Sequence, residues 1–120
     1  MYRRYNPRIA QPSKYRAKKV VAEGQTFDSH KEYTEWLKLR LREKNGEIEN
    51  LQRQVRFELI PKQVGADGKC LERACHYVAD FVYIENGETV VLDTKGFRTK
   101  DYVIKKKLML FVHGIRIKEI

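Results

Sequence analysis

The sequence predicts a mixed α/β (α+β) domain in which helices cover both faces of one sheet. The expected order is helix, three-strand antiparallel meander, helix, strand. Three observations support it: two segments with helical periodicity, β-type runs between them, and an Asn86-Gly87 dipeptide at the centre of those runs. The 120 residues are enough for a single hydrophobic core. We therefore expect two parts, a basic flexible arm over 1–19 and one domain over 20–120.

The first helix is expected over about 30–44. Ser29 is a preferred N-cap residue, Glu32 follows three residues later as in a capping box, and Asn45-Gly46 supplies the end. One face repeats every 3.6 residues and is expected to lie against the sheet. It consists of Tyr33, Trp36, Leu37, Arg40 and Leu41.

Three strands are expected to form the meander. The first covers 55–59, where apolar and charged residues alternate until Pro61. The second covers about 70–85 and the third 88–95, joined by Asn86-Gly87, which is the strongest short-range hairpin signal. Both hairpin arms are apolar on both faces, so helices are expected on both sides of the sheet.

The second helix is expected over about 100–113, between an N-cap at Thr99 and a stop at Gly114. A last strand over 115–120 would return through a right-handed crossover and lie parallel to a neighbouring strand. The helix stripe expected to be buried consists of Val103, Ile104, Leu108 and Phe111.

The formal net charge of +9 is concentrated at the N-terminus, where residues 1–22 carry seven Lys or Arg and no acidic residue. Such an excess favours a polyanionic partner, nucleic acid before an acidic membrane surface. A solvated solubility tail is the alternative, and a solvated helix face is the alternative for the lysines of the second helix. The residues expected to bind nucleic acid are Arg3, Arg4, Arg8, Lys14, Arg16, Lys18 and Lys19 in the N-terminal region, and Lys100, Lys105, Lys106 and Lys107 on the second helix.

Hydropathy and cysteine content predict a cytoplasmic protein. The longest purely apolar run, 108–112, is far shorter than the roughly 20 residues that span a bilayer, so no membrane partner is expected. Two cysteines are too few for a disulfide framework, and no apolar signal segment follows the basic N-terminus. Reduced thiols and no small-molecule cofactor are expected.

Three charged residues are expected to converge on one face of the hairpin. If Asn86-Gly87 forms a two-residue turn, Asp80 faces Asp93, with Cβ atoms about 4.5 to 5.5 Å apart. Lys95 lies two residues beyond Asp93 and shares its face. Charges inside an apolar sheet are costly, so the cluster favours a metal site over an ion pair beside an exposed acid, or over a slipped register. Mg²⁺ fits, because one or two carboxylates, waters and a substrate phosphate commonly hold it.

These residues resemble the motif of the PD-(D/E)xK nuclease superfamily, whose core order is also helix, three strands, helix, strand. Asp80, the Asp93-Thr94-Lys95 triplet and the helix acid Glu32 carry the resemblance, which covers nearly the whole chain after residue 19. Ala79 replaces the proline of the motif, and position 93 is Asp rather than Glu. The segments KYRAKK, FDSHKE, FELIPK, YVADF and DTKGFRTKDY further resemble small phage-encoded nuclease-like proteins, relatives of Holliday-junction resolvases and transposon end-cutting endonucleases.

The resemblance implies a restriction-endonuclease-like core and a role for each motif residue. Asp80, Asp93 and the main-chain carbonyl of Thr94 would ligate Mg²⁺, for which Mn²⁺ would substitute. Lys95 would orient or help deprotonate the attacking water and stabilise charge on the phosphate. Glu32 would complete or tune the site, although a capping box explains it without catalysis.

The expected function is therefore that of a Mg²⁺-dependent endodeoxyribonuclease that hydrolyses phosphodiester bonds. Branched DNA is the expected substrate, in phage recombination or DNA processing in the host cytoplasm, because no domain for reading base sequence is evident. Symmetric cutting of two strands would need a homodimer. The alternatives are a non-catalytic nucleic-acid-binding module and a nuclease subunit of a larger recombination or packaging complex. Facing aspartates argue against a pure polyanion binder.

Overall fold

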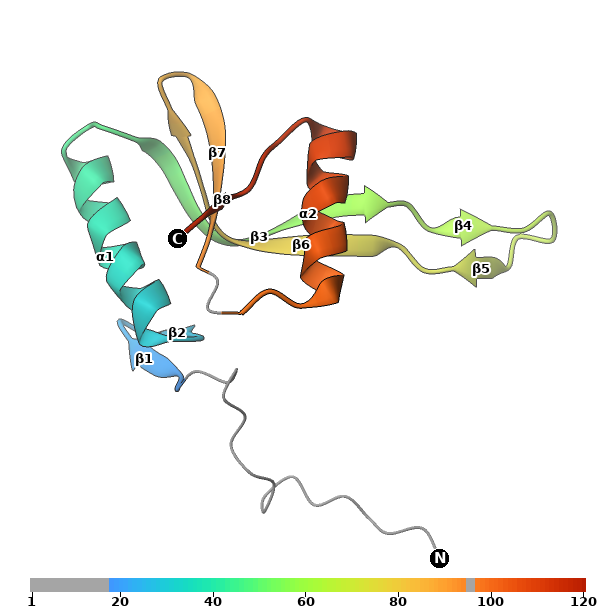
Figure 1. The fold of residues 1–120 in the computed structure, drawn as a ribbon, viewed down its shortest axis with the longest axis horizontal. Coiled ribbons are helices and arrows are strands. Elements are labelled where there is room, and N and C mark those ends of the chain that lie inside the picture. Colours follow the sequence, from blue (N-terminus) through green and yellow to red (C-terminus); the bar gives the residue numbers. More distant parts are fainter. Residues whose placement is uncertain (1–17, 95–96) are drawn as a thin grey trace, which may run out of the picture.

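A four-stranded mixed sheet forms the centre of the computed structural model, which describes residues 18–94 and 97–120 (Figure 1). Its strand order is β3-β6-β7-β8, with β3, β6 and β7 antiparallel and β8 parallel to β7. This mixed α+β arrangement agrees with the predicted meander followed by a returning parallel strand. The strands are β3 (Glu49–Ile60), β6 (Cys75–Glu85), β7 (Glu88–Asp93) and β8 (Lys118–Glu119).

The two helices, α1 (His30–Lys44) and α2 (Lys100–His113), begin and end as predicted. Each N-terminus is closed by a hydroxyl group. The Ser29 Oγ accepts a hydrogen bond from the third helical N–H of α1 at 3.1 Å, and the Thr99 Oγ1 does the same for α2 at 3.0 Å. Gly114 ends α2 with a φ of 69°, a left-handed conformation that glycine adopts without strain.

The buried face of α2 is not the one predicted. Tyr102 and Met109, two turns apart, are buried, whereas Ile104 is 59% exposed and Phe111 is 87% exposed. Val103 also lies at the surface, and of the predicted stripe only Leu108 packs partly against the core. The helical period was correct but its phase was wrong, because the Tyr102 ring enters the core while its hydroxyl reaches a carboxylate.

The buried face of α1 is displaced in the same way. Leu39 is buried and Trp36 packs beside it, while Leu37 and Leu41 are exposed. The fully buried Glu32 lies one turn before Trp36 and two turns before Leu39, so an acid belongs to the inward stripe. A hydropathy pattern assigns an acid to the outer face, which explains the wrong phase.

Strand β3 begins at Glu49, well before the predicted start near 55. Asn50 and Gln54 have φ values of 55° and 52°, in the left-handed region that interrupts regular strand geometry. The apolar alternation is therefore lost over this half of the strand. For that reason the sequence pattern placed the start of the strand near residue 55.

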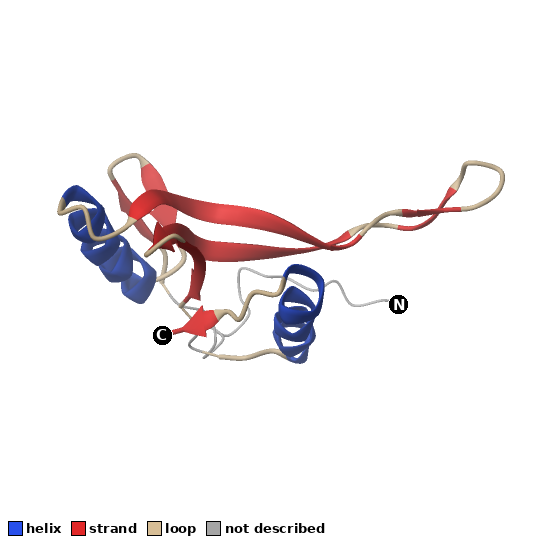
Figure 2. Cartoon of the chain, turned by 90° about the horizontal axis from the view of Figure 1, so that it is seen from above, coloured by secondary structure: helices blue, strands red, loops and turns tan. Residues whose placement is uncertain are grey.

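The strand predicted over 70–85 is divided in two. Its first part, β5 (Cys70–Glu72), pairs with a strand that was not predicted, β4 (Gln63–Val64), and forms a hairpin arm that projects beyond the sheet (Figure 1, Figure 2). A second small hairpin, β1 (Val20–Ala22) and β2 (Gln25–Phe27), precedes α1.

Two hydrophobic clusters fill opposite sides of the sheet. The neighbouring residues Val91 and Leu92 of β7 belong to different clusters, as alternation requires when both faces are covered. The predicted two-sided covering is therefore confirmed. The α2 cluster contains Leu59, Tyr77, Ala79, Val82, Val91, Tyr102, Met109 and Ile117, and the α1 cluster contains Leu39, Ile48, Phe81, Tyr83 and Leu92.

Strand β8 covers only two residues of the predicted 115–120, yet it ties the chain end to α2. The Glu119 carboxylate accepts a hydrogen bond from the Tyr102 hydroxyl at 2.6 Å and pairs with Arg98 and with the Lys106 Nζ, the latter at 3.3 Å. Burial raises the pKa of Glu119, but the Tyr102 hydrogen bond and the two cations outweigh it and hold the pKa below its ordinary value.

We expect the Glu119 cluster to lose its stabilising effect in acid. Because the folded-state pKa lies below the ordinary value of 4.5, the stabilisation is complete above pH 4.5 and is lost as the pH falls through the folded-state pKa. Urea unfolding of wild type and Glu119→Gln between pH 7 and pH 3 measures this. The difference in the free energy of unfolding should shrink below pH 4.5. A difference that stays constant across this range would contradict the expectation.

Candidate active site

The register of the β6–β7 hairpin, on which the predicted closeness of Asp80 and Asp93 depends, is the predicted one. Glu85 pairs with Glu88, and the ladder of β6 and β7 continues in register to Phe81 and Leu92. The two aspartates follow directly at the end of this ladder. Two carboxylates on neighbouring strands repel each other, so each needs its own hydrogen-bond donors.

Asp93 is fully buried and is held by a tyrosine. Its Oδ2 accepts a hydrogen bond from the Tyr77 hydroxyl at 2.8 Å, within the buried face that α2 covers. Burial raises the pKa of Tyr77, and the charges of Asp93 and Asp80 raise it further. The hydroxyl therefore stays protonated near neutral pH and remains a donor to Asp93.

Asp80 is half-buried and is held by Thr94. Its Oδ2 accepts two hydrogen bonds, from the Thr94 N–H at 2.9 Å and from the Thr94 hydroxyl at 2.8 Å. Its Oδ1 lies 3.4 Å from the Nε2 of Gln54. The sequence predicted a role for the Thr94 carbonyl only, whereas the N–H and hydroxyl of this residue orient Asp80.

Glu32 is buried at the start of α1, and its carboxylate does more than cap the helix. In a capping box it would accept the Ser29 N–H, but the backbone N–H that its Oε1 accepts is that of Asp28, at 3.0 Å. Its Oε2 accepts from Arg53 at 3.2 Å and from Gln54 at 3.0 Å. Burial raises the pKa of Glu32, and the charge of Asp80 raises it further, against the lowering effect of the Asp28 and Arg53 hydrogen bonds.

Gln54 brings the two carboxylates to one point. Its amide nitrogen lies within hydrogen-bond distance of both Glu32 Oε2 and Asp80 Oδ1. Gln54 is itself exposed, so this point borders solvent. A carboxylate from α1 and a carboxylate from β6 therefore face the same small space, where a cation or a water molecule could replace the amide.

The site lies where the two hydrophobic clusters meet. Ala79 belongs to the α2 cluster and Phe81 to the α1 cluster, although residues two apart in a regular strand share one face. On β3, Val55 packs on the α2 cluster while the Arg53 guanidinium lies over Phe27, on the α1 side. Asp80 lies between these two residues, where the strand changes from one cluster to the other, and so can reach residues on both sides of the sheet.

Arg53 is a site residue that the sequence analysis missed. Its guanidinium lies 3.9 Å from the centre of the Phe27 ring and donates to the Gln25 side chain at 2.9 Å and to the Thr26 carbonyl at 3.1 Å. These contacts hold it against Glu32. It was overlooked because the predicted strand began only at 55, so residues 49–54 were not assigned to it.

The remaining predicted site residues are placed as follows. Lys95 lies outside the described residues, as do Arg3, Arg4, Arg8, Lys14 and Arg16. Lys18, Lys19, Lys100 and Lys107 are exposed, Lys105 pairs with Asp101 at 3.7 Å, and Lys106 pairs with Glu119.

The donor set fits Mg²⁺ better than a metal that needs a complete protein cage. Over 18–94 and 97–120, no group of three or more His, Cys, Asp or Glu is arranged to hold a metal ion. The groups that come close are oxygen donors, the carboxylates of Glu32 and Asp80, with Asp93 on the next strand. Mg²⁺ commonly binds to one or two carboxylates and completes its shell with water and phosphate.

A protein-family model matches residues 12–116, a segment that contains Glu32, Gln54, Asp80 and Asp93, and its description is "Protein of unknown function (DUF1064)". The chain belongs to the DUF1064 family. No curated protein and no solved structure matches it. In the described part of this DUF1064 protein, neither helix has the length and apolar composition needed to cross a bilayer.

Proposed function

We propose that this DUF1064 protein is a metal-dependent endodeoxyribonuclease of the PD-(D/E)xK type. The observation that supports it most is the approach of Glu32 and Asp80 to the amide of Gln54, with Asp93 at the end of the adjacent strand. The element order α1, β3, β6, β7, α2, β8 supports a restriction-endonuclease-like core, because the superfamily has the same order. Helix α2 follows this motif in the chain and carries Lys100 and Lys107 at its surface, where they are available to a polyanionic substrate.

In this proposal Asp80, Asp93 and the Thr94 carbonyl would hold Mg²⁺ or Mn²⁺. The bound metal would polarise the phosphate and lower the pKa of the attacking water. Thr94 fixes the rotamer of Asp80 through two hydrogen bonds, and Tyr77 fixes that of Asp93. Both carboxylates are thus preorganised before substrate binds.

Glu32 would exchange a proton during the reaction. Its raised pKa brings the carboxyl group closer to neutral pH, where a general acid or base is most effective. Its Oε2 accepts a hydrogen bond from the Gln54 amide, which also lies within hydrogen-bond distance of Asp80 Oδ1. The role of Lys95, which is to orient or help deprotonate the attacking water and to stabilise charge on the phosphate, remains a prediction from the motif.

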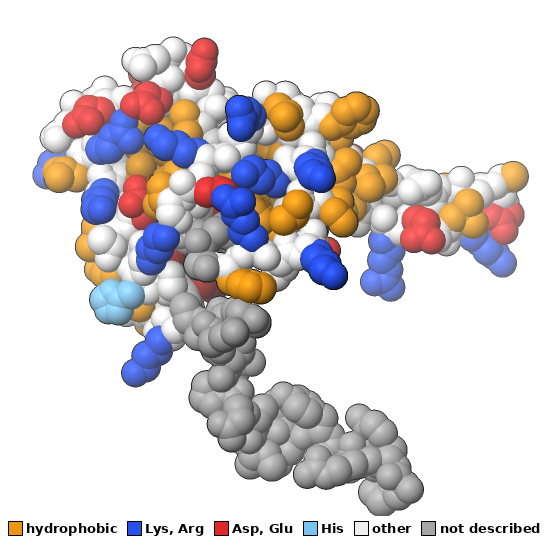
Figure 3. All heavy atoms as spheres, viewed as in Figure 1, with side chains coloured by type: hydrophobic (Ala, Val, Ile, Leu, Met, Phe, Trp, Pro, Cys, Tyr) orange, Lys and Arg blue, Asp and Glu red, His pale blue; other side chains and the backbone are white. Residues whose placement is uncertain are grey.

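The proposed substrate is branched DNA. Basic side chains gather on the face that carries α2, beside exposed hydrophobic side chains (Figure 3). Such a surface contacts the sugar-phosphate backbone and so responds to the shape of the DNA more than to its base sequence. Symmetric cutting of a four-way junction would need two copies of the site, and a homodimer is part of the proposal.

The test is cleavage of a labelled immobile four-way junction, with linear duplex and single strand alongside. Wild-type protein is tested in Mg²⁺ and in EDTA. The Asp93→Asn variant is tested beside it under the same conditions. The matched control is Asp67→Asn, which makes the same change at an exposed aspartate between β4 and β5. Paired nicks near the branch are expected for wild type and Asp67→Asn in Mg²⁺ only.

Three other results would change the proposal. Equal cutting of all substrates would retain the nuclease and remove the preference for branches. Tight binding without cutting in Mg²⁺ or Mn²⁺ would favour the non-catalytic binding module or a missing partner subunit. Full activity of Asp93→Asn would remove this residue from the site.

A further inference from the structure

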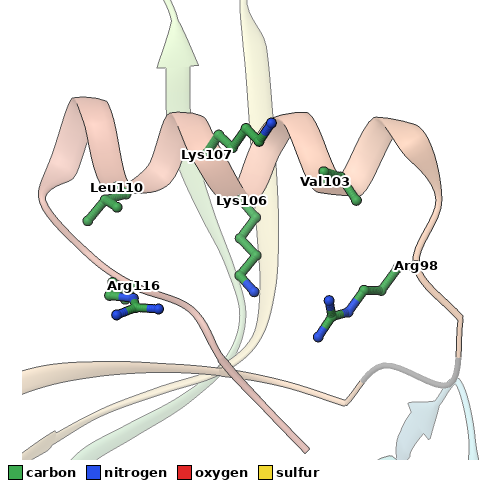
Figure 4. Close-up of a pocket in the computed structure, with 6 residues that line it drawn as sticks. All are labelled: Arg98, Val103, Lys106, Lys107, Leu110 and Arg116. Atoms are coloured by element: carbon green, nitrogen blue, oxygen red, sulfur yellow. The ribbon is translucent and has the colours of Figure 1, made fainter.

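A basic pocket of about 320 Å³ lies beside α2 (Figure 4). Four of its lining residues are cationic and two are aliphatic. Its volume is at the small end of the range for small-ligand sites. The lining consists of Arg98, Val103, Lys106, Lys107, Leu110 and Arg116.

The fold explains why these residues meet. The four lining residues from α2 are spaced i, i+3, i+4 and i+7 from Val103 and therefore share one face of the helix. Arg98 lies just before the N-cap, and the turn at Gly114 brings Arg116 back along the helix. In Figure 4 the side chains of Arg98, Lys106 and Arg116 reach into the space beneath the helix, and that of Lys107 lies along its edge.

The pocket carries a net positive charge, although one carboxylate pairs with two of its lining residues. Glu119 pairs with Arg98 and Lys106 and so balances part of their charge. Lys107 and Arg116 are exposed and add two further positive charges. Like charges gathered in one hollow repel each other, and a bound anion would relieve that repulsion. Arginine side chains provide the forked donors that match phosphate oxygens.

The pocket borders the candidate active site. Glu119 of β8 pairs in register with Asp93 of β7, so the two backbones are about 4.8 Å apart. Asp93 and Glu119 both accept a hydrogen bond from a tyrosine of the α2 cluster, Tyr77 and Tyr102 respectively. An anion held by Arg98 and Lys106 would therefore lie close to a strand bound at Asp93.

We propose that this pocket binds a phosphate of the DNA strand adjacent to the phosphate attacked at the candidate active site. Val103 and Leu110 then provide the wall against which the neighbouring sugar or base lies. The assignment of DNA as the ligand rests on the proposed function. An anionic lipid headgroup offers the same phosphate chemistry. The ion pairs that join Arg98 and Lys106 to Glu119, the strand partner of Asp93, favour the nucleic acid.

The test uses Lys107→Ala combined with Arg116→Ala. These two residues are exposed and lie outside the ion pairs of Glu119, so the fold and β8 should be unaffected. The matched control is Lys38→Ala combined with Lys44→Ala, which removes two exposed lysines from α1. Binding of a dye-labelled junction is followed by fluorescence anisotropy in EDTA, over a series of NaCl concentrations. Thermal melting checks that each variant is folded.

The pocket variant should bind the junction about tenfold more weakly. The slope of log K against log[NaCl] should decrease in magnitude by about one, as expected for one lost phosphate contact. The control should change affinity by less than about twofold. An unchanged slope in the pocket variant would overturn the proposal. Equal losses in both variants would also overturn it, since they indicate diffuse charge attraction. Unchanged DNA binding with lost binding to phosphatidylglycerol vesicles would assign the pocket to lipid instead.

The experiment is independent of catalysis, because no metal is present. If wild type cuts no DNA but the pocket variant still shows the lower salt dependence of DNA binding, the nuclease proposal fails and the pocket proposal stands. If wild type cuts and the slope is unchanged, the pocket fails and the nuclease stands.

Discussion

Replacing Asp80 with Asn should reduce single-turnover cleavage of a four-way junction by about 10³-fold or more without unfolding the protein. The amide oxygen can still accept the Thr94 N–H at the Oδ2 position, so the contact with Thr94 survives, whereas the NH2 at the Oδ1 position no longer accepts from Gln54. The negative charge needed to bind a metal is lost. Removing this charge also lowers the pKa of Glu32 toward its ordinary value, because Asp80 raises it. The melting temperature should therefore stay constant or rise.

Thr94→Val provides the matched comparison for Asp80→Asn. It removes the hydroxyl donor and leaves the backbone N–H in place, so Asp80 is oriented less firmly. A loss of about 10- to 100-fold is expected, as for other residues that orient a metal ligand. Wild-type rates for Asp80→Asn would refute its catalytic role. A large fall in melting temperature would show that Asp80 is a structural residue.

Phe81→Ala should lower the free energy of unfolding by about 3 to 5 kcal/mol. Phe81 is completely buried in the α1 cluster, where its ring stacks on Trp36 with 6.2 Å between centroids. Such a loss is a large part of the roughly 5 to 15 kcal/mol that stabilises a typical domain. Urea unfolding followed by far-UV circular dichroism measures it.

Phe111→Ala makes the same chemical change at the surface of α2. Phe111 is 87% exposed, so a change of less than about 0.5 kcal/mol is expected. This control also tests the orientation of α2, because the sequence pattern placed Phe111 in the core. Comparable losses for the two variants would mean that α2 lies on the sheet with the face predicted from the sequence.

The sequence predicted the helix ends and the hairpin register because local chemistry determines them. Ser29 and Thr99 close their helices through their own hydroxyl groups, and Gly114 ends α2 through its left-handed backbone. Asn86 and Gly87 both adopt a positive φ, at 53° and 78°, as a tight hairpin turn requires. That turn alone placed Asp80 and Asp93 on neighbouring strands.

The helix faces and the partners of the site residues could not be predicted, because they depend on tertiary contacts. Nothing local to α1 indicates that Glu32 is buried, since its partners Arg53 and Gln54 lie more than 20 residues away. In α2, the tyrosine at 102 is buried because Glu119 offers its hydroxyl a partner. A pattern that sorts residues only by hydropathy misses both cases.

The projecting arm of β4 and β5 should behave as a separate unit of local unfolding. Every residue of its two short strands is exposed, and a two-stranded hairpin without a covered face is only marginally stable in water. Its amide protons would exchange with solvent through small openings that leave β6 and the two clusters intact. We therefore expect the molecule to combine a slowly exchanging sheet, to which Asp80 and Asp93 belong, with a tip that opens and closes on its own.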